Sequence, residues 1–214
     1  MKSDAEYGLR DPQSMTTIQE LNPRDFDRAG ESLGQAFETD PMVQWMSPDA
    51  ATRARFTRQF TRVPLRYGLR YGRVTESNDG QAVSIWTPPE RPISMIGLIR
   101  CGMLAMPFQI GFVPFSRFLS ANAVMGRFHE KHASEPHWYL FAIGVAPELQ
   151  GRGLGTALIT EGLQRADQDG CPCYLETSSE RNVPYYERFG FRVVGQALLG
   201  KDGPLGWAMR REVP

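Results

Sequence analysis

The sequence predicts an α/β fold built as one domain. Runs rich in β-branched and aromatic residues alternate with stretches of helical periodicity along most of the chain. Short β-prone runs near both ends meet at turn signals, which indicates antiparallel hairpins beside the alternating part. With 214 residues, of which 41% are hydrophobic, the chain can bury a core without disulfides or metals. We therefore expect one domain over residues 16–214, preceded by a flexible tail over 1–15.

The first helix is predicted by its cap. A weakly alternating strand over 16–21 is followed by Asn22 and Pro23, an N-cap residue with proline at the first helical position. Apolar residues then recur at three- and four-residue spacing as far as Phe37, the mark of one buried helical face. We expect the helix to end there, in a loop over 38–41.

A longer helix and a hairpin are expected next. Residues 51–69 have helical character and carry five arginines, which we interpret as a solvated basic face rather than a ligand site. Strands over 71–76 and 81–86 follow, joined through Asp79 and Gly80, a strong hairpin signal.

Residues 92–133 are predicted to be helical but divided by prolines and glycines into two or three pieces. The segment is rich in Met and Phe, and we interpret its part over 93–118 as helices that are buried or face a substrate. No apolar run in that part reaches the ~18 residues of a membrane-spanning helix.

The second half of the chain alternates most clearly. Its longest β-branched and aromatic run ends at Ala146 and Pro147, which predicts a central strand. The expected elements are strands over 138–145, 173–177, 191–198 and 206–210 and helices over 156–168 and 182–189.

The composition excludes several classes of function. The formal net charge is zero, so nothing draws the chain toward nucleic acid. Three cysteines in no zinc-like or CxxC spacing indicate a reducing compartment and neither a disulfide framework nor a metal site. The first 15 residues contain acidic residues and no apolar core, unlike a signal peptide. We therefore expect a cytoplasmic protein with no metal and no nucleic-acid or membrane partner.

A glycine-rich loop between a predicted strand and helix is the strongest chemical signal. Gly151, Gly153 and Gly155 let several backbone amides converge on a diphosphate at the positive end of the helix, and Arg152 adds charge. A dinucleotide fingerprint requires glycine or alanine where this chain has Thr156, and a P-loop requires a Gly-Lys-Ser/Thr that is absent. On this motif alone, a purely structural turn stays open as an alternative.

Two motifs resemble one family. The loop Gln150-Gly151-Arg152-Gly153-Leu154-Gly155 resembles the Gln/Arg-x-x-Gly-x-Gly/Ala hallmark of the GNAT superfamily of acetyl-CoA-dependent N-acetyltransferases. Glu176, Asn182 and the run Tyr186-Glu187-Arg188-Phe189-Gly190-Phe191 are similar to the strand Glu, the Asn and the Tyr-Glu-x-x-Gly-Phe ending of that family. The run Glu135-Pro136-His137-Trp138 also looks like the puromycin N-acetyltransferase branch.

The resemblance implies a single domain with a twisted, mixed, largely antiparallel sheet of six or seven strands flanked by helices. The strands at Val145 and Glu176 would splay apart, so that the pantetheine of acetyl-CoA lies between them. Asn182 would bond the pantetheine arm, although its residue type is equally consistent with an N-cap for the next helix. The residues that the resemblance assigns to acetyl-CoA binding are Ile143, Val145, Gln150, Gly151, Arg152, Gly153, Leu154, Gly155, Thr156 and Asn182.

Acetyl transfer from a thioester needs a neutral amine, a stabilised oxyanion and a proton for the departing thiolate. The resemblance assigns the proton donor to Tyr186, and Tyr185 points elsewhere on the helix. A backbone amide of the splayed strand, best matched at Val145, would stabilise the oxyanion.

The base is less well defined. Glu176 corresponds to a strand Glu that some bacterial relatives use, and His137 and Glu38 are fallbacks. The acid that the family commonly has upstream in the first central strand is absent, with Tyr139 near its position. A single-residue base therefore does not follow from the resemblance.

We expect the chain to acetylate an amine of a small molecule, as a monomer or a homodimer. The resemblance is faint over 93–133, and substrate choice is expected to reside there. Two alternatives are acetylation of a peptide or protein amine and a noncatalytic acyl-CoA-binding module. The intact Tyr186 and glycine loop argue against the second alternative.

Overall fold

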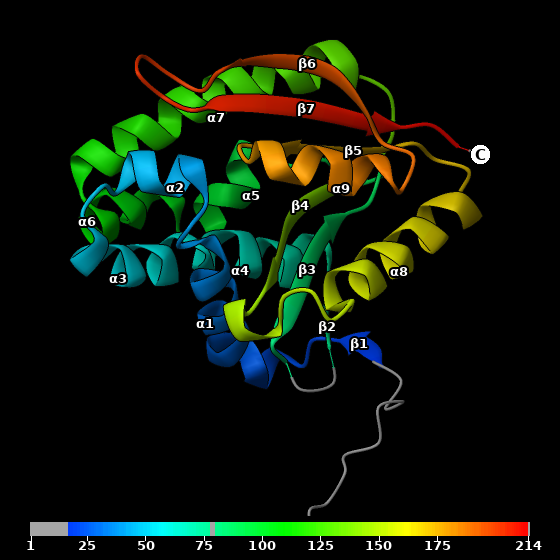
Figure 1. The fold of residues 1–214 in the computed structure, drawn as a ribbon, viewed down its shortest axis with the longest axis horizontal. Coiled ribbons are helices and arrows are strands. Elements are labelled where there is room, and N and C mark those ends of the chain that lie inside the picture. Colours follow the sequence, from blue (N-terminus) through cyan, green and yellow to red (C-terminus); the bar gives the residue numbers. More distant parts are fainter. Residues whose placement is uncertain (1–16, 78–79, 214) are drawn as a thin grey trace, which may run out of the picture.

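The structure is a computed structural model and describes residues 17–77 and 80–213. The expected tail over 1–15 and Asp79 of the hairpin signal lie outside the described residues. A central sheet has helices on both of its faces (Figure 1).

The seven strands of the described residues form one sheet in the order β1-β2-β3-β4-β5-β7-β6. Neighbouring strands are antiparallel except β4 and β5, which are parallel. This mixed, largely antiparallel sheet confirms the predicted fold class. The strands are β1 (Ile18–Glu20), β2 (Arg73–Ser77), β3 (Ala82–Thr87), β4 (Trp138–Val145), β5 (Cys173–Thr177), β6 (Arg192–Leu198) and β7 (Leu205–Arg211).

β4 and β5 pair over a very short distance. Trp138 lies opposite Cys173 and Tyr139 lies opposite Tyr174, and no further pair joins these two strands in the described part of the chain. β4 continues along β3, where Phe141 is an extra residue that bulges the strand. The predicted divergence of the two central strands is confirmed.

Helices cover the sheet on both faces. α8 packs on the face of β3 that carries Trp86, whereas α1 and α4 cover the face that carries Val83 and Ile85. α7 lies along β6 and β7 (Figure 1). The α-helices are α1 (Phe26–Phe37), α2 (Pro41–Met46), α3 (Ala50–Phe60), α4 (Arg62–Tyr71), α5 (Met95–Arg100), α6 (Met106–Ile110), α7 (Phe112–His132), α8 (Leu154–Gln168) and α9 (Val183–Glu187).

The helix predicted over 51–69 is in fact two helices. α3 ends at Phe60 and α4 begins at Arg62. Pro64 explains the break, because it has no N–H to bond the carbonyl of Phe60 four residues earlier.

The first helix ends at Phe37 as predicted, and the loop predicted over 38–41 covers 38–40, because a second helix begins at Pro41. The carboxylate of Asp40 accepts hydrogen bonds from the N–H groups of Met42 (2.9 Å) and Val43 (3.2 Å), and Pro41 occupies the first position of α2. The Asp-Pro pair, which we predicted to lie in the loop, is an N-cap followed by proline at the start of the next helix.

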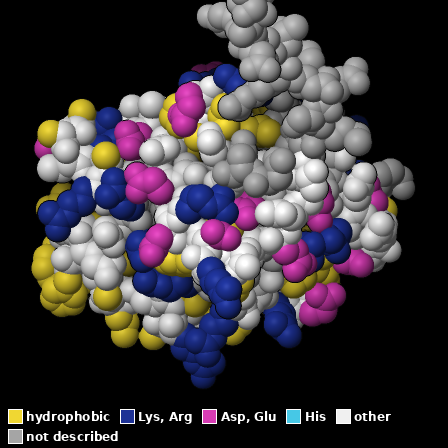
Figure 2. All heavy atoms as spheres, turned by 90° about the horizontal axis from the view of Figure 1, so that it is seen from below, with side chains coloured by type: hydrophobic (Ala, Val, Ile, Leu, Met, Phe, Trp, Pro, Cys, Tyr) yellow, Lys and Arg dark blue, Asp and Glu magenta, His cyan; other side chains and the backbone are white. Residues whose placement is uncertain are grey.

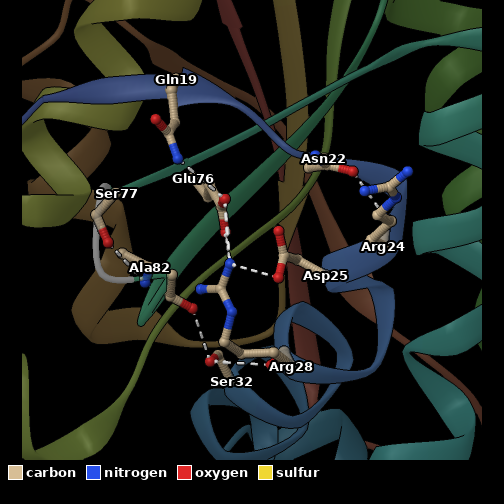
Figure 3. Close-up of polar contacts among 10 residues, drawn as sticks. Gln19, Asn22, Arg24, Asp25, Arg28, Ser32, Glu76, Ser77 and Ala82 are labelled. Atoms are coloured by element: carbon tan, nitrogen blue, oxygen red, sulfur yellow. Dashed lines mark hydrogen bonds and ion pairs between the residues drawn. The ribbon is translucent and has the colours of Figure 1, made fainter.

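A buried carboxylate holds α1 against the edge of the sheet. Glu76 of β2 accepts hydrogen bonds from Arg28 of α1 (Nη2 to Oε2, 2.9 Å) and from Gln19 of β1 (3.3 Å), and Arg28 also pairs with Asp25 (Figure 3). A buried carboxylate is tolerated when it has a countercharge and hydrogen bonds. The network fixes α1, whose far end leads directly to Asp40.

The helices predicted over 93–118 to be buried or to face a substrate are only partly so. Met103 and Met106 are buried, but several large apolar side chains of the same segment and its continuation are exposed. Figure 2 shows hydrophobic side chains along the left edge, the side on which α6 lies in Figure 1. No helix in the described ranges is long and apolar enough to cross a membrane. The exposed side chains are Met95, Ile96, Ile99, Leu104, Phe108, Phe112, Val113 and Leu119.

We predict that Gly162→Ala destabilises the fold by about 1–3 kcal/mol. A Cβ at position 162 of α8 would lie 2.3 Å from the ring of Trp86, which is fully buried and has no room to move. Urea unfolding would measure the loss.

Gly126→Ala in α7 is the matched control. A Cβ there meets nothing within 4 Å, so helix propensity alone should stabilise the protein by up to ~1 kcal/mol. Equal free energies of unfolding for the two variants would contradict this account of the packing between α8 and β3.

Candidate active site

A cavity of about 780 Å³ opens where β4 and β5 diverge. Its walls come from β4, β5 and the helices α1 to α7, together with the start of α9. The cavity brings together the predicted residues Tyr186, Glu176, Asn182 and Ile143. Residues far apart in the sequence therefore share one space at the expected place in the sheet.

Glu176 of β5 is buried at the wall of this cavity, with 4% of its side chain exposed. Burial raises the pKa of its carboxyl group to about 7, and the nearby hydroxyls of Tyr139 and Tyr174 oppose the shift. Its Oε2 atom has no hydrogen-bond partner among the described residues. A carboxyl with this pKa exchanges a proton readily at neutral pH.

His129 of α7 faces the same carboxylate and was missed from the sequence. Its Nδ1 lies 3.8 Å from Oε1 of Glu176, and its ring packs against those of His137, Tyr139 and Tyr174. Burial, followed by the proximity of His137, lowers the pKa of His129 to about 4. The ring is therefore neutral at pH 7 and can accept a proton. Its position in the irregular 92–133 segment gave no signal in the sequence.

Tyr186 is buried on α9 and lines the cavity. Burial raises the pKa of its phenol above the ordinary value, and Tyr185 and Asp40 raise it further. The phenol is therefore protonated at neutral pH and able to donate. Tyr185 does not line the cavity. Its hydroxyl faces the backbone of Gly155, as the predicted difference in direction requires.

Asp40 adds a second carboxylate to the cavity wall and was not predicted as a site residue. Ser178, just beyond β5, donates its hydroxyl to both carboxylate oxygens (2.8 and 2.9 Å). Burial raises the pKa of Asp40, against the effect of Ser178 and of the N–H groups at the start of α2. The α2 cap is thereby attached to the strand that carries Glu176.

The glycine loop lies at the β4 end of the site, outside the cavity wall. Gly151 and Gly153 have φ values of +80° and +85°, and a Cβ on either would meet nothing within 4 Å. The side-chain amide of Gln150 donates to the carbonyl of Val145 (3.1 Å). α8 begins at Leu154, two residues before the predicted start, so its free N–H groups follow the loop directly.

Of the other residues considered from the sequence, some line the cavity and some do not. Asn182 lines the cavity and makes no capping hydrogen bond to α9, so the N-cap alternative is not realised. His137 and Tyr139 line the cavity, whereas Glu38 does not. No group of three or more side chains suited to a metal ion is found among the described residues.

Several known proteins are similar to this chain in sequence or in fold. A model of the acetyltransferase (GNAT) family matches residues 109–191. An uncharacterised N-acetyltransferase of Schizosaccharomyces pombe is 26% identical over 196 residues, which cover 85% of this chain and 76% of that protein. The chain is therefore similar in sequence to the GNAT acetyltransferases, and these matches support acetyltransferase activity of that type.

Two further matches show less, because one covers a short region and the other has low sequence identity. The mycothiol acetyltransferase of Streptomyces coelicolor is 38% identical over 63 residues, which are 28% of this chain but only 20% of that enzyme. A crystal structure from Corynebacterium glutamicum, described as "histone acetyltransferase HPA2 and related acetyltransferase", matches with a TM-score of 0.63. That match is 22% identical in sequence and covers 93% of this chain and 97% of the other, so it shows the shared fold. Resemblance to the puromycin N-acetyltransferase branch stays a prediction.

GNAT enzymes use acetyl-CoA as co-substrate, and the chain offers features that fit it. The open space over Gly151 and Gly153, next to the start of α8, suits a diphosphate. The edge of β4 that β5 leaves free leads from this loop toward the cavity.

We predict that Glu176→Gln changes how stability depends on pH. The wild-type carboxyl has a pKa of about 7 in the fold against 4.5 for the free group, so the folded state binds the proton more tightly. This contribution to stability is fully present below pH 4.5 and is lost as the pH rises through 7. Between pH 5 and pH 8 the wild type should lose roughly 2–3 kcal/mol that the Gln variant keeps.

Urea unfolding of both proteins at the two pH values would measure this difference. Glu180→Gln, on an exposed residue close in the sequence, controls for the substitution itself. A stability difference between the wild type and Glu176→Gln that stays the same at pH 5 and pH 8 would rule out the raised pKa.

Proposed function

We propose that this protein transfers the acetyl group of acetyl-CoA to an amine of a small molecule. The observation that supports the proposal is the cavity at the divergence of β4 and β5, lined by both Glu176 and Tyr186. A cavity of about 780 Å³ has the size of a small-molecule site.

In this proposal the glycine loop and β4 hold the co-substrate. The N–H groups of residues 150–156 would bind the diphosphate, with Arg152 exposed beside them. Ile143 and Val145 would offer backbone groups to the pantetheine, and Asn182 would hydrogen-bond it. Acetyl-CoA supplies a thioester whose acetyl group is the one transferred.

Different side chains are proposed to accept the proton of the amine and to donate a proton to the departing sulfur. Glu176 takes the proton that the amine must lose, for which a pKa of about 7 is well placed. His129 stabilises the neighbouring carboxyl. Tyr186, kept protonated by burial, supplies the proton for the sulfur, and the N–H of Val145 stabilises the charge on the acetyl oxygen.

A peptide or protein amine is the alternative acceptor. The similarity to a mycothiol acetyltransferase favours a small acceptor instead, although the shared region is only 20% of that enzyme. The puromycin-branch resemblance also favours a small acceptor. The cytoplasmic location and the monomeric or homodimeric state stay predictions.

We predict that Tyr186→Phe lowers kcat by at least ~100-fold, because the phenol is the proton donor. Acetyl-CoA turnover against a panel of small amines and peptides, followed at the released thiol, would measure it. Acetyl-CoA affinity, measured by calorimetry, should be unchanged.

Tyr185→Phe is the control, because it removes a neighbouring phenol oxygen that does not line the cavity. Full activity of Tyr186→Phe would show that another group donates the proton. If wild type acetylates peptides but none of the small amines, the proposed acceptor class is wrong.

We predict that Gly153→Ala weakens acetyl-CoA binding about 10-fold, equivalent to ~1.4 kcal/mol. At φ +85° an alanine is strained, and its Cβ would project into the open space above the loop. Calorimetric titration with acetyl-CoA would measure the affinity.

Gly170→Ala is matched to it, because Gly170 at the other end of α8 also has positive φ (+62°) and open surroundings. Both variants should lose similar stability, but only Gly153→Ala should lose affinity. Unchanged binding in Gly153→Ala would contradict the diphosphate role of the loop.

A further inference from the structure

The charged side chains of the cavity are all of one sign. Four of its lining residues are acidic, and no Lys or Arg is among the described residues that line it. His129 and His137 add no positive charge at neutral pH, because burial lowers the pKa of both. The acidic residues are Asp40, Glu130, Glu135 and Glu176.

Only two of these carboxylates lie at the reacting end without a countercharge. Glu135 pairs with Arg210 outside the cavity, and Glu130 is exposed to solvent. Asp40 and Glu176 remain. Arg181 is the nearest cation whose charge affects Asp40, but it is exposed and donates to Thr39 (3.5 Å).

Ser178 connects Asp40 to the end of β5. It donates to the Asp40 carboxylate and follows Glu176 by two residues along the chain. Asp40 also raises the pKa of the Tyr186 phenol, so it lies near the other proposed catalytic group. A positively charged amine that enters this end therefore meets acidic side chains and no cation among the described lining residues.

Another part of the cavity wall is apolar. Methionine, phenylalanine, leucine and valine side chains from α3 to α7, and from the short 3-10 helix between α5 and α6, form it, and the same residues belong to one hydrophobic cluster. Flexible methionine side chains adapt to bulky apolar groups. The residues of this part are Phe60, Val63, Leu98, Met103, Met106 and Phe118.

We propose that the acceptor is a cationic amine on a large apolar body that carries no carboxylate or phosphate, and that Asp40 determines this preference. The inference rests on the proposed function and narrows its substrate class. An anionic group on the acceptor would find no Lys or Arg among the described lining residues and would lie near acidic side chains in a poorly solvated space, where a charge without a countercharge is costly. An apolar body is favoured because it occupies the Met- and Phe-lined part.

The test compares amines that share a body and differ in charge. Phenethylamine with phenylalanine, and tryptamine with tryptophan, are two such pairs, and glucosamine 6-phosphate adds a polar, phosphorylated amine. The kcat/KM of wild type should be at least ~10-fold higher for the amine lacking the carboxylate in each pair, and glucosamine 6-phosphate should be the poorest acceptor.

Asp40→Asn tests the residue itself. Asparagine keeps the size and the N-cap acceptor of aspartate but removes the charge, so the ratio within each pair should fall at least 3-fold. Asp49→Asn is the matched control, because Asp49 caps α3 in the same way and does not line the cavity. Its ratios should equal those of wild type.

The outcomes separate this inference from the proposed function. Faster acetylation of phenylalanine, tryptophan or glucosamine 6-phosphate would overturn the inference and leave small-molecule acetylation standing. Acetylation of peptides alone would overturn the proposed function. Equal ratios for Asp40→Asn and wild type, with both folded by circular dichroism, would remove Asp40 as the determinant.

Discussion

The short pairing between β4 and β5 is the constraint on which the site depends. Two parallel strands normally continue side by side, with their backbone groups bonded to each other. Here the bonds stop after Tyr139 and Tyr174, and the bulge at Phe141 turns β4 away. The divergence leaves one strand edge free beside the glycine loop and opens the sheet into the cavity. We thus propose that acetyl-CoA binds along the free edge of β4 and that the amine binds in the cavity, on either side of the point where β4 and β5 diverge.

Burial in the cavity wall shifts the pKa values of the ionisable groups in the direction that favours their neutral forms. Burial disfavours charge, so it raises the pKa of Glu176 and Tyr186 and lowers that of His129. The carboxyl of Glu176 and the imidazole of His129 are moved toward their neutral forms, and the phenol of Tyr186 is kept in its neutral form. Glu176 can then exchange a proton at neutral pH, which suits a reaction that begins with an ammonium and ends with a thiol.

Only the residues that belong to short sequence motifs could be proposed for the site from the sequence. The glycine loop follows from its residues, whereas Tyr186 and Asn182 follow from the resemblance to family motifs that span one turn or one helix start. Asp40 and His129 were missed because their roles arise from packing. Asp40 acts through Ser178, which is 138 residues away, and His129 faces Glu176 only because α7 lies across the sheet. Fold class and element order followed from periodicity, whereas Pro64 showed that a proline near a helix start can divide what periodicity joins.

Because only two residue pairs join β4 to β5 in the described part of the chain, the sheet consists of two parts that are weakly connected to each other. β1 to β4 form one hydrogen-bonded ribbon and β5 to β7 another, and side-chain packing around Trp138 and the phenol of Tyr186 holds the ribbons together. Such a junction can flex without breaking the ladder on either side. We therefore expect the two ribbons to behave as separate cooperative units in amide hydrogen exchange, with the first opening at the junction of β4 and β5.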